Sequence, residues 1–409
     1  MTNTIEVPFD IENVEVIGTQ INEAGQFIIT VKSTLESACC HSCVWSATKL
    51  YGHSDARLVK HTSSFGLETY IRFYPKRYEC PHCGKTTTQS LSGLELRCHH
   101  TIAYENHILL QLVNSTVSDV AIKENLSFDS VQGIIDRHID KNVNWDLHDK
   151  IELLGLDEIS CKKGHKDFVV IVTTRVDNKT TILAVLKDRK KDTVKKFLKT
   201  IPKRLRKTIK AVCSDMYEGF INAAKEVLRV KIVVDRFHIA KLYRKSLDSL
   251  RKSEMKHLKK ELPEAEYKEL KNVMWILRKN PFDLDYDEQM VLIRLFKHSP
   301  ILELAYRLCN DLTGIFDQVI SKFEAKRKIK AWKRRVKKSK LTCFDRFLST
   351  LTKWEKEILN YFDERHTSGF VEGLNNKIKV IKRRCYGILN IGHWFQRIYL
   401  DIEGYSLFA

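Results

Sequence analysis

The stretch Ser368-Gly-Phe-Val-Glu372-Gly-Leu-Asn-Asn-Lys-Ile-Lys-Val-Ile-Lys-Arg-Arg384 carries more information than any other part of this 409-residue chain. At helical spacing its apolar residues form one stripe, made of Val371, Leu374, Ile378 and Ile381. A second, polar stripe holds Glu372, Asn376, Lys379 and Arg383. One carboxylate therefore lies in the first turn of a predicted helix and cations follow it, a pattern that suits a metal-assisted reaction on a polyanion.

Two further carboxylates end apolar, strand-like runs far upstream. Asp157 closes the run Leu153-Leu-Gly-Leu-Asp157, and Asp215 closes the run Ile209-Lys-Ala-Val-Cys-Ser-Asp215. Three such acids on a basic chain predict phosphoryl transfer on nucleic acid.

The charge of the chain indicates a polyanionic partner. Its 70 Lys+Arg against 51 Asp+Glu give a net charge of +19, for which nucleic acid is the leading explanation. An acidic membrane surface and ribosomal or chaperone clients are the alternatives. The segment 321–340 holds eleven Lys/Arg and one acid, Glu324, and is either a DNA-binding face or a solvated helix face.

The sequence predicts no membrane partner and a cytoplasmic location. No apolar run reaches the roughly 18 residues of a membrane span, and the first residues lack the charged and apolar regions of a signal peptide. Seven of the eleven cysteines are scattered, which favours a reduced compartment.

Periodicity divides the chain into an α+β multidomain protein. Residues 1–97 read as a β-rich module, because Phe27–Val31 and Glu68–Tyr74 alternate polar and apolar positions. Residues 98–150 read as three helices.

From residue 151 the pattern predicts a ribonuclease H-like domain. Its element order is β-β-β-α-β-α-β, with strands expected at Leu153–Ile159, Phe168–Val176, Thr180–Leu186, Ile209–Cys213 and Lys231–Val234 and helices near Thr193–Leu205 and Tyr217–Leu228. Residues 239–350 read as a helical insertion, so the catalytic domain would comprise 151–238 and 351–409. Such a sheet places the end of its first strand beside its fourth, which brings Asp157 next to Asp215.

Two C-x-x-C pairs predict a structural zinc site in the first module. The ligands would be Cys40, Cys43, Cys80 and Cys83, since a two-residue spacer lets one knuckle supply two sulfurs to tetrahedral Zn²⁺. Gly84 suits the tight turn after the second knuckle. His41 and His82 are expected to be bystanders, and Cys39 is a spare or alternative ligand.

The segment from Thr116 predicts a helix-turn-helix. Thr116 and Ser127 are expected to cap its two helices, and Asn125 tolerates the left-handed turn between them. The second helix would offer Ser130, Gln132, Gly133 and Arg137 to a DNA groove. A purely structural three-helix bundle is the alternative.

Four motifs together resemble the IS-L-three family of bacterial DDE insertion-sequence transposases. They are Gly155-Leu-Asp157-Glu-Ile-Ser, Ser214-Asp215-Met-Tyr-Glu-Gly-Phe, Asp235-Arg-Phe-His238-Ile-Ala-Lys and Ser368-Gly-Phe-Val-Glu372-Gly-Leu-Asn-Asn-Lys-Ile-Lys. The resemblance spans roughly residues 30–400 and includes an N-terminal zinc ribbon and a helix-turn-helix.

This resemblance implies a DNA transposase whose catalytic, Mg²⁺-binding (or Mn²⁺-binding) triad is Asp157, Asp215 and Glu372. It implies binding to the terminal inverted repeats of an insertion sequence, strand cleavage and strand transfer into double-stranded target DNA. Because two ends are joined, a homodimer on DNA is expected, in the bacterial cytoplasm at the nucleoid.

Several residues near the triad have open roles. Glu158 competes with Asp157, although in a strand it points to the opposite face. Asp235 and His238 form a D-x-x-H step that is either accessory to catalysis or structural. Contacts to transposon-end DNA are expected from Asn375, Asn376, Lys379, Lys382 and Arg383.

Two other functions compete with transposition. A DNA-binding repressor with an inactive C-terminal domain would lack triad carboxylates, and all three are present. A ribonuclease H-like nuclease explains the acids but not the ribbon, the helix-turn-helix or the insertion.

Overall fold

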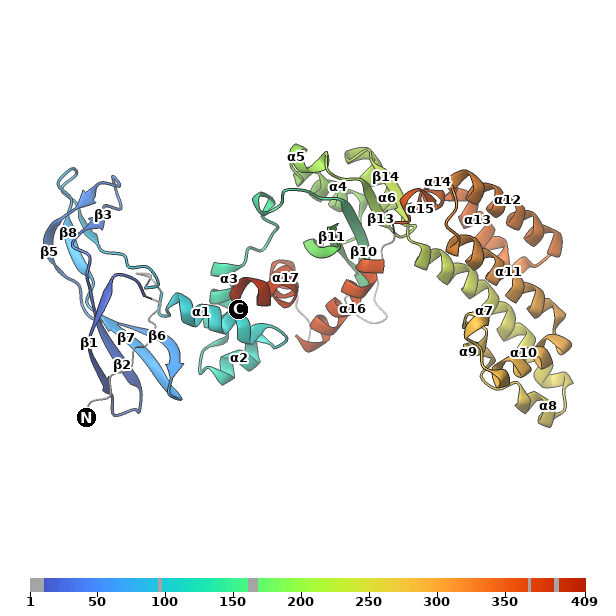
Figure 1. Cartoon of the computed structure of the whole chain (residues 1–409), viewed down its shortest axis with the longest axis horizontal. Coiled ribbons are helices and arrows are strands. Elements are labelled where there is room, and N and C mark those ends of the chain that lie inside the picture. The colour runs from blue at the N-terminus through green and yellow to red at the C-terminus, as the bar shows by residue number, and fades with distance from the viewer. Residues whose placement is uncertain (1–10, 95–97, 161–167, 367–368, 386–389) are drawn as a thin grey trace. The chain divides into compact units, whose positions relative to one another are not determined.

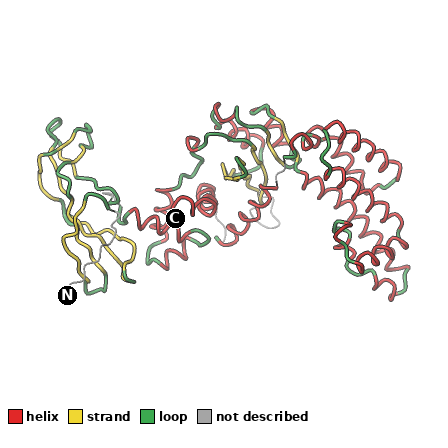
Figure 2. Tube along the Cα trace, in the orientation of Figure 1, coloured by secondary structure: helices red, strands yellow, loops and turns green. Residues whose placement is uncertain are grey.

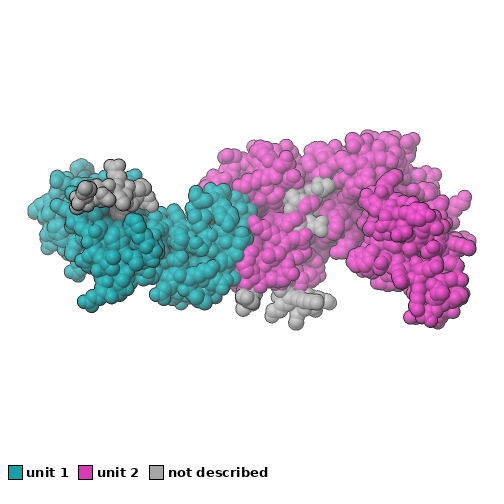
Figure 3. Space-filling view, turned by 60° about the horizontal axis from the view of Figure 1, so that its bottom comes forward, with its two compact units in different colours: residues 1–140, 399–409 teal, residues 141–398 magenta. Residues whose placement is uncertain are grey.

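The computed structural model describes residues 11–94, 98–160, 168–366, 369–385 and 390–409. The chain folds into two compact units. One comprises residues 1–140 and 399–409 and the other residues 141–398, and Figure 3 colours them separately. No described helix is long and apolar enough to cross a membrane.

The first unit begins with a four-stranded sheet in the order β1-β2-β7-β6 (Figure 1). Its strands are β1 (Val14–Ile21), β2 (Phe27–Ser33), β6 (Arg57–Ser64) and β7 (Leu67–Phe73). The central pair β2–β7 is parallel and the outer pairs are antiparallel. Every second residue of β7 from Thr69 to Phe73 is buried, so the predicted alternation in both β2 and β7 marks real strands.

Smaller sheets carry the cysteine pairs. Strands β3 (Ala38–Cys39) and β4 (Ser46–Ala47) form a two-stranded ladder, and β5 (Lys49–His53), β8 (Lys76–Glu79) and β9 (Thr86–Thr88) form a three-stranded sheet. Strands thus fill much of the sequence between the two knuckles.

Three helices follow, as periodicity predicts: α1 (Ile102–Leu112), α2 (Val117–Lys123) and α3 (Phe128–His138). The Thr116 hydroxyl accepts from the Asp119 N–H, and the Ser127 hydroxyl accepts from the Ser130 N–H. Asn125 between the helices has φ +51°. Both predicted caps and the predicted left-handed turn are therefore present.

The C-terminal residues complete this helical core, which the sequence does not predict. Leu400, in helix α17 (Ile391–Phe408), is buried among residues of α1, α2 and α3. The Asp401 carboxylate accepts a hydrogen bond of 2.9 Å from the Asn114 N–H. Residues 399–409 thus belong to the first unit, whereas the expected catalytic segment runs to 409, and residues 141–150 belong to the second unit.

The second unit is built on a five-stranded sheet in the order β12-β11-β10-β13-β14. The strands are β10 (Leu153–Ser160), β11 (Phe168–Val176), β12 (Lys179–Leu186), β13 (Ala211–Ser214) and β14 (Lys231–Val234). The first three are antiparallel, and β13 is parallel to both β10 and β14. First and fourth strands are therefore neighbours, as expected.

Helices pack against this sheet. They are η1 (Trp145–Leu147), α4 (Lys191–Thr200), α5 (Lys203–Arg206), α6 (Glu218–Val227) and α16 (Gly369–Arg384). Helix α4 contacts α6, and α16 contacts β10. Apolar side chains of α4 and α6, such as Val194 and Phe220, are fully buried against the strands.

The rest of the unit is helical (Figure 2). Its elements are α7 (Arg236–Glu261), α8 (Glu264–Glu269), α9 (Val273–Ile276), η2 (Pro281–Asp283), α10 (Tyr286–His298), α11 (Pro300–Asp317), α12 (Lys322–Ser339), η3 (Thr342–Phe344), α13 (Asp345–Lys353), α14 (Glu355–Leu359) and α15 (Tyr361–Glu364). The expected boundary at 239 falls inside α7, because Asp235 caps a helix that starts directly after β14. The Asn360 amide donates to the Ile232 carbonyl over 2.7 Å, which ties the end of α14 back to the sheet.

Candidate active site

Three aspartates lie at the same register on three adjacent parallel strands, Asp157 within β10 and the other two directly after β13 and β14. Leu156 of β10 pairs with Ser214 of β13, which pairs with Val234 of β14. The next residue along each strand is an acid, namely Asp157, Asp215 and Asp235. Parallel pairing therefore gathers three carboxylates at one edge of the sheet.

Each of these carboxylates is held by a backbone N–H near its own strand end. The Oδ1 atoms of Asp157, Asp215 and Asp235 accept hydrogen bonds from the N–H groups of Glu158, Tyr217 and Phe237 over 2.8, 3.0 and 3.1 Å. Strand β10 itself, a short loop and the N-terminus of α7 supply these donors, so the local chain geometry fixes one oxygen of every acid.

The cluster disfavours full ionisation. Burial raises the pKa of Asp157, and the charges of Glu158 and Asp235 raise it further. Burial and the neighbouring Asp157 carboxylate raise the pKa of Asp215 to about 6. Like charges brought together in a partly buried site raise carboxyl pKa values in this way, and a divalent cation would reverse the effect.

Helix α16 contacts the cluster through a buried amide. Asn375 is 3% exposed and lies on the same face as the buried Ile378 and Ile381. Its Nδ2 donates to Asp157 Oδ2 over 2.5 Å. Asn375 was expected to contact DNA, and its burial corrects that expectation.

The burial of Asn375 could have been predicted from its position in the sequence. It lies three residues before Ile378, which is the spacing that defines the buried stripe of the helix. An amide at that position must find a partner inside the protein.

The remaining residues of α16 divide between exposed and anchored positions. Asn376, Lys379 and Arg383 are exposed, and Lys382 donates to the Ser160 carbonyl over 2.8 Å. Glu372 lies in α16 three residues before Asn375, but its side chain is outside the described part of the structure.

Glu158, the competitor of Asp157, has a different environment. It accepts from Arg189 Nη1 at 2.9 and 3.3 Å. The Arg189 guanidinium also lies over the rings of Phe168 and Tyr217, 4.6 and 5.1 Å from their centroids. Glu158 thus forms an ion pair with Arg189, a residue that no sequence motif indicated.

Asp235 is the most buried of the three aspartates, at 2% exposure. Its Oδ2 lies 4.0 Å from His238 Nε2, one turn along α7. The D-x-x-H step therefore combines a helix cap with an imidazole beside the acids.

A groove of about 660 Å³ opens from this cluster. Residues 215–217 after β13 line one end of it, and residues of α7, α13 and the ends adjoining α13 line the remainder.

Comparison with known proteins identifies the family. Residues 154–398, which contain the whole acid cluster, match the family of transposases of the DDE, ISL3 type. The chain belongs to the IS-L-three family of DDE transposases.

Relatives agree over most of the chain. The transposase of insertion sequence element IS1001 from Bordetella parapertussis is 26% identical over 382 residues, which cover 92% of this chain and 91% of that protein. The transposase of IS1557 from Mycobacterium tuberculosis is 20% identical over 342 residues, 78% of this chain and 76% of that protein. The present chain is a DNA transposase.

The cysteines of the transposase form a compact cluster. The Sγ atoms of Cys40, Cys43, Cys80 and Cys83 all lie within 4.8 Å of one another. Three Sγ–Sγ distances are 3.5, 3.6 and 3.7 Å. A tetrahedral ion with bonds of about 2.3 Å separates its sulfurs by about 3.8 Å, so the donor set fits one such ion.

The two knuckles have matching backbones. The N–H groups of Cys40 and Cys80 donate to the carbonyls of Trp45 and Lys85, and their carbonyls accept from Val44 and Gly84, all over 2.9 Å. The last residue of each turn has positive φ, +62° at Val44 and +69° at Gly84. The predicted turn at Gly84 is therefore present.

Neither histidine within the knuckles joins the cluster. His41 Nδ1 lies 3.2 Å from the Thr87 hydroxyl, and His82 stacks on Trp45. Among the described residues, the four cysteines are the one set of three or more ligand atoms at such mutual distances.

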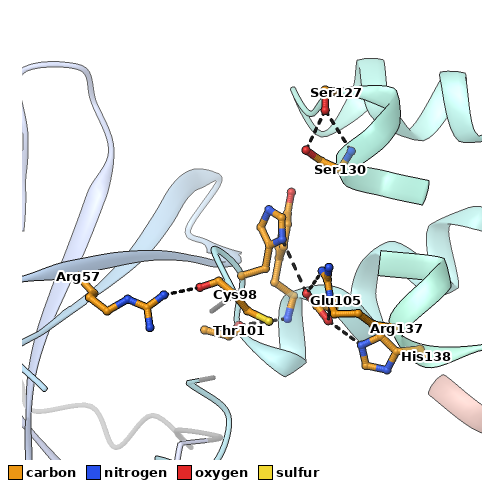
Figure 4. A network of polar contacts seen from close by, with 10 residues as sticks. Arg57, Cys98, Thr101, Glu105, Ser127, Ser130, Arg137 and His138 are labelled. Carbon is orange, nitrogen blue, oxygen red and sulfur yellow. Dashed lines mark hydrogen bonds and ion pairs between the residues drawn. The ribbon is translucent and has the colours of Figure 1, made fainter. Parts of the chain in front are cut away.

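Helix α3 of the transposase is anchored by a buried acid (Figure 4). Glu105 of α1 accepts from Arg137 Nη2 and lies 2.6 Å from His138 Nε2. Burial alone would raise the pKa of Glu105, but hydrogen bonds with His100, His138 and Arg137 hold it well below its usual range. Gln132 donates to Asp136 over 3.0 Å on the same helix.

Proposed function

We propose that Asp157, Asp215 and Glu372 are the catalytic triad of this transposase and jointly bind two Mg²⁺ (or Mn²⁺) ions. The observation that carries the proposal is the shared register of Asp157 and Asp215, which directly follow the last residue pair of the parallel β10–β13 ladder. Their raised pKa values support it, because excess negative charge creates a demand for a cation.

The position of Glu372 supports its place in the triad. Residues three apart on a helix are neighbours on one face, and Asn375 of the same helix already contacts Asp157. Helix α16 would therefore bring the third carboxylate to the sheet edge, although 156 residues separate Glu372 from Asp215 in the chain.

The chain's own residues would bind and position the reacting groups. Paired divalent ions, when bound, activate the attacking oxygen and stabilise the leaving oxygen of an in-line displacement at phosphorus. Asn375 would orient Asp157, while Asp235 and His238 would act as accessory groups beside the acids.

The order β12-β11-β10-β13-β14 supports a ribonuclease H-like catalytic domain. We propose four parts for the chain: a zinc ribbon (residues 1–97), a helix-turn-helix (98–150), the catalytic domain (151–238 and 351–409) and the helical insertion (239–350). Because Leu400 packs on α1–α3 and residues 399–409 belong to the first compact unit, the catalytic domain would end near residue 398.

Binding of double-stranded DNA would be divided among several surfaces. The four cysteines would hold structural Zn²⁺, and α3 would present Gln132 and Arg137 to the terminal inverted repeats. Asn376, Lys379, Lys382 and Arg383 of α16 would contact DNA near the acids. Two ends must be joined, so the active species would be a homodimer on DNA at the bacterial nucleoid.

A strand-transfer assay tests the function. Purified protein, Mg²⁺ and DNA carrying the inverted repeats that flank this gene should yield cleaved ends joined to a target plasmid. Asp157→Asn, Asp215→Asn and Glu372→Gln should each abolish most of both steps, and combining them should cost little more. Cleavage without any joining would favour a nuclease, and full activity of one triad variant would remove that residue from the triad.

A further inference from the structure

The groove between α7 and α13 has a charge pattern that the triad does not explain. Asp215 is the one carboxylate among the described residues that line it. Beyond Asp215 the lining becomes cationic, with Lys241 and Lys245 on α7 and Arg346 and Lys353 on α13. The groove therefore leads from an acidic end to a basic channel.

We propose that this groove binds a single DNA strand that leaves the acid cluster, with its phosphates on Lys241, Lys245 and Arg346. The inference rests on the proposed function, because Asp215 places one end of the groove at the site of phosphoryl transfer. It adds a strand-binding subsite that belongs to the helical insertion.

The three cations are available for a ligand. Lys241, Lys245 and Arg346 are exposed, and no carboxylate in the described part of the chain pairs with any of them. Lys353, in contrast, forms an ion pair with Glu218. Unpaired cations in a shallow channel form an electrostatic track for a phosphate backbone.

The spacing of the cations follows the helices. Lys241 and Lys245 are four residues apart on α7 and share one face. The rings of Tyr243 and Phe347 pack edge to face with centroids 5.7 Å apart, which joins α7 to α13 beneath the groove. Arg346 precedes Phe347 on α13, so this ring contact holds Arg346 at the same groove as the two lysines.

The size of the groove favours one strand over a duplex. Its 660 Å³ lies within the range of about 300–1,000 Å³ that is typical of small-molecule sites. Such a volume accommodates a short run of nucleotides and not the width of a double helix. The exposed Ser249 hydroxyl adds an uncharged donor along it, whereas the hydroxyls of Ser246 and Thr350 donate to the Leu242 and Arg346 carbonyls.

The test compares two DNA probes in EDTA, where no cleavage occurs. One is a blunt duplex, and the other is the same duplex with a single-stranded thymidine extension. The full-length protein should bind the extended probe more tightly. Three phosphate contacts on a single strand add about 2 to the slope of log affinity against log salt, so this gain should fall roughly 20-fold between about 50 and 200 mM salt.

Variants of the groove should remove only the effect of the extension. Lys241→Ala, Lys245→Ala and Arg346→Ala should each lower the added slope by about 0.7, and the triple variant should bind both probes equally. The charge-conserving set Lys241→Arg, Lys245→Arg and Arg346→Lys should keep the gain.

A matched control uses three exposed cations of α12. Lys326→Ala, Lys330→Ala and Arg334→Ala should leave the gain from the extension intact, whatever they do to duplex binding. A gain that is absent in the wild-type protein, or that survives the groove triple variant, would overturn the proposal.

The same preparations separate this proposal from the proposed function. If Asp157→Asn loses joining, and the wild-type protein binds the extended probe no more tightly than the blunt one, the groove proposal is rejected and the active-site proposal stands. If the wild-type protein binds the extended probe more tightly, but Asp157→Asn still joins DNA, the triad is rejected and the groove proposal stands.

Discussion

The amide of Asn375 donates a hydrogen bond of 2.5 Å to the Asp157 carboxylate, although 217 residues separate them in the chain. Asp157 Oδ1 is already held by the Glu158 N–H. Both oxygens of this acid are therefore oriented before any cation or DNA arrives, one by its own strand and the other by α16.

Asn375→Ala is expected to lower the rate of strand joining by about 10–100-fold, the typical cost of losing a group that orients a metal ligand. Binding to transposon-end DNA should be unchanged, because Asn375 is buried. Joining rates and DNA affinity measured on one preparation check this. Val380→Ala, at an exposed position of the same helix, is the control, and an equal loss of joining in both variants would contradict a positioning role.

Glu158→Gln should retain most of its joining activity, because Glu158 serves Arg189 and lies outside the proposed triad. The substitution also removes a negative charge that raises the pKa values of Asp157 and Asp215, so it should lower both pKa values and slightly weaken the attraction of the site for a cation. Joining assays beside Asp157→Asn provide the measurement. An inactive Glu158→Gln with an active Asp157→Asn would place the first acid of the triad one residue later.

Binding of Mg²⁺ or Mn²⁺ should release protons near pH 6 and release few at pH 8. The pKa of Asp215 is raised to about 6 from an ordinary 3.8, so at pH 6 about half a proton per chain must leave this group when a cation binds. Calorimetry in two buffers of different ionisation enthalpy measures the release. The Asp215→Asn variant should not release this half proton at pH 6. Equal proton release at both pH values in the wild-type protein would contradict the raised pKa of Asp215.

The same pKa shift fixes the sign of a stability effect. A folded-state pKa above the unfolded value stabilises the metal-free fold fully below pH 3.8, and this contribution is lost as pH rises through about 6. Asp215→Asn should therefore melt at a higher temperature than the wild-type protein at pH 7 without metal. Added Mg²⁺ should reduce that difference.

Cys43→Ser and Cys83→Ser should each release about one zinc per chain and unfold the N-terminal β module, since the metal supplies much of the folding free energy of such small sheets. Atomic absorption and far-ultraviolet circular dichroism measure the two effects. Cys39→Ser is the control, because the Cys39 thiol contacts the Val44 carbonyl outside the cluster. Full zinc in both ligand variants would remove the site.

Val44→Gly should stabilise the first knuckle by about 1 kcal/mol. Val44 has φ +62°, a conformation that costs a β-branched residue about 1–3 kcal/mol and a glycine almost nothing. Because Val44 is 78% exposed, little packing is lost, and the backbone entropy of glycine offsets only part of the gain. Slower zinc loss to a chelator is the expected result, and Gly84→Val in the second knuckle should have the opposite effect.

The sequence alone determined the local structure of this protein. Alternation in Phe27–Val31 and Glu68–Tyr74 predicted strands, and Thr116, Asn125 and Ser127 predicted the ends of α2 and α3. These signals are sufficient because caps, turns and periodic faces depend on residues only a few positions apart. Two short cysteine spacings likewise predicted the cluster that the fold brings together.

Beyond the Asp157–Asp215 pair and the four cysteines, only the tertiary structure decided which distant groups meet. Burial of Asn375 against Asp157, the commitment of Glu158 to Arg189 and the packing of Leu400 on α1–α3 all join segments far apart in the chain. The sequence placed acids at the ends of apolar runs, and β10 continues three residues past Asp157. Register, helix orientation and the path of the last helix depend on packing across the whole domain. Local patterns do not encode that packing, which is why the acids could be predicted while the side chains that hold them, Asn375 and Arg189, could not.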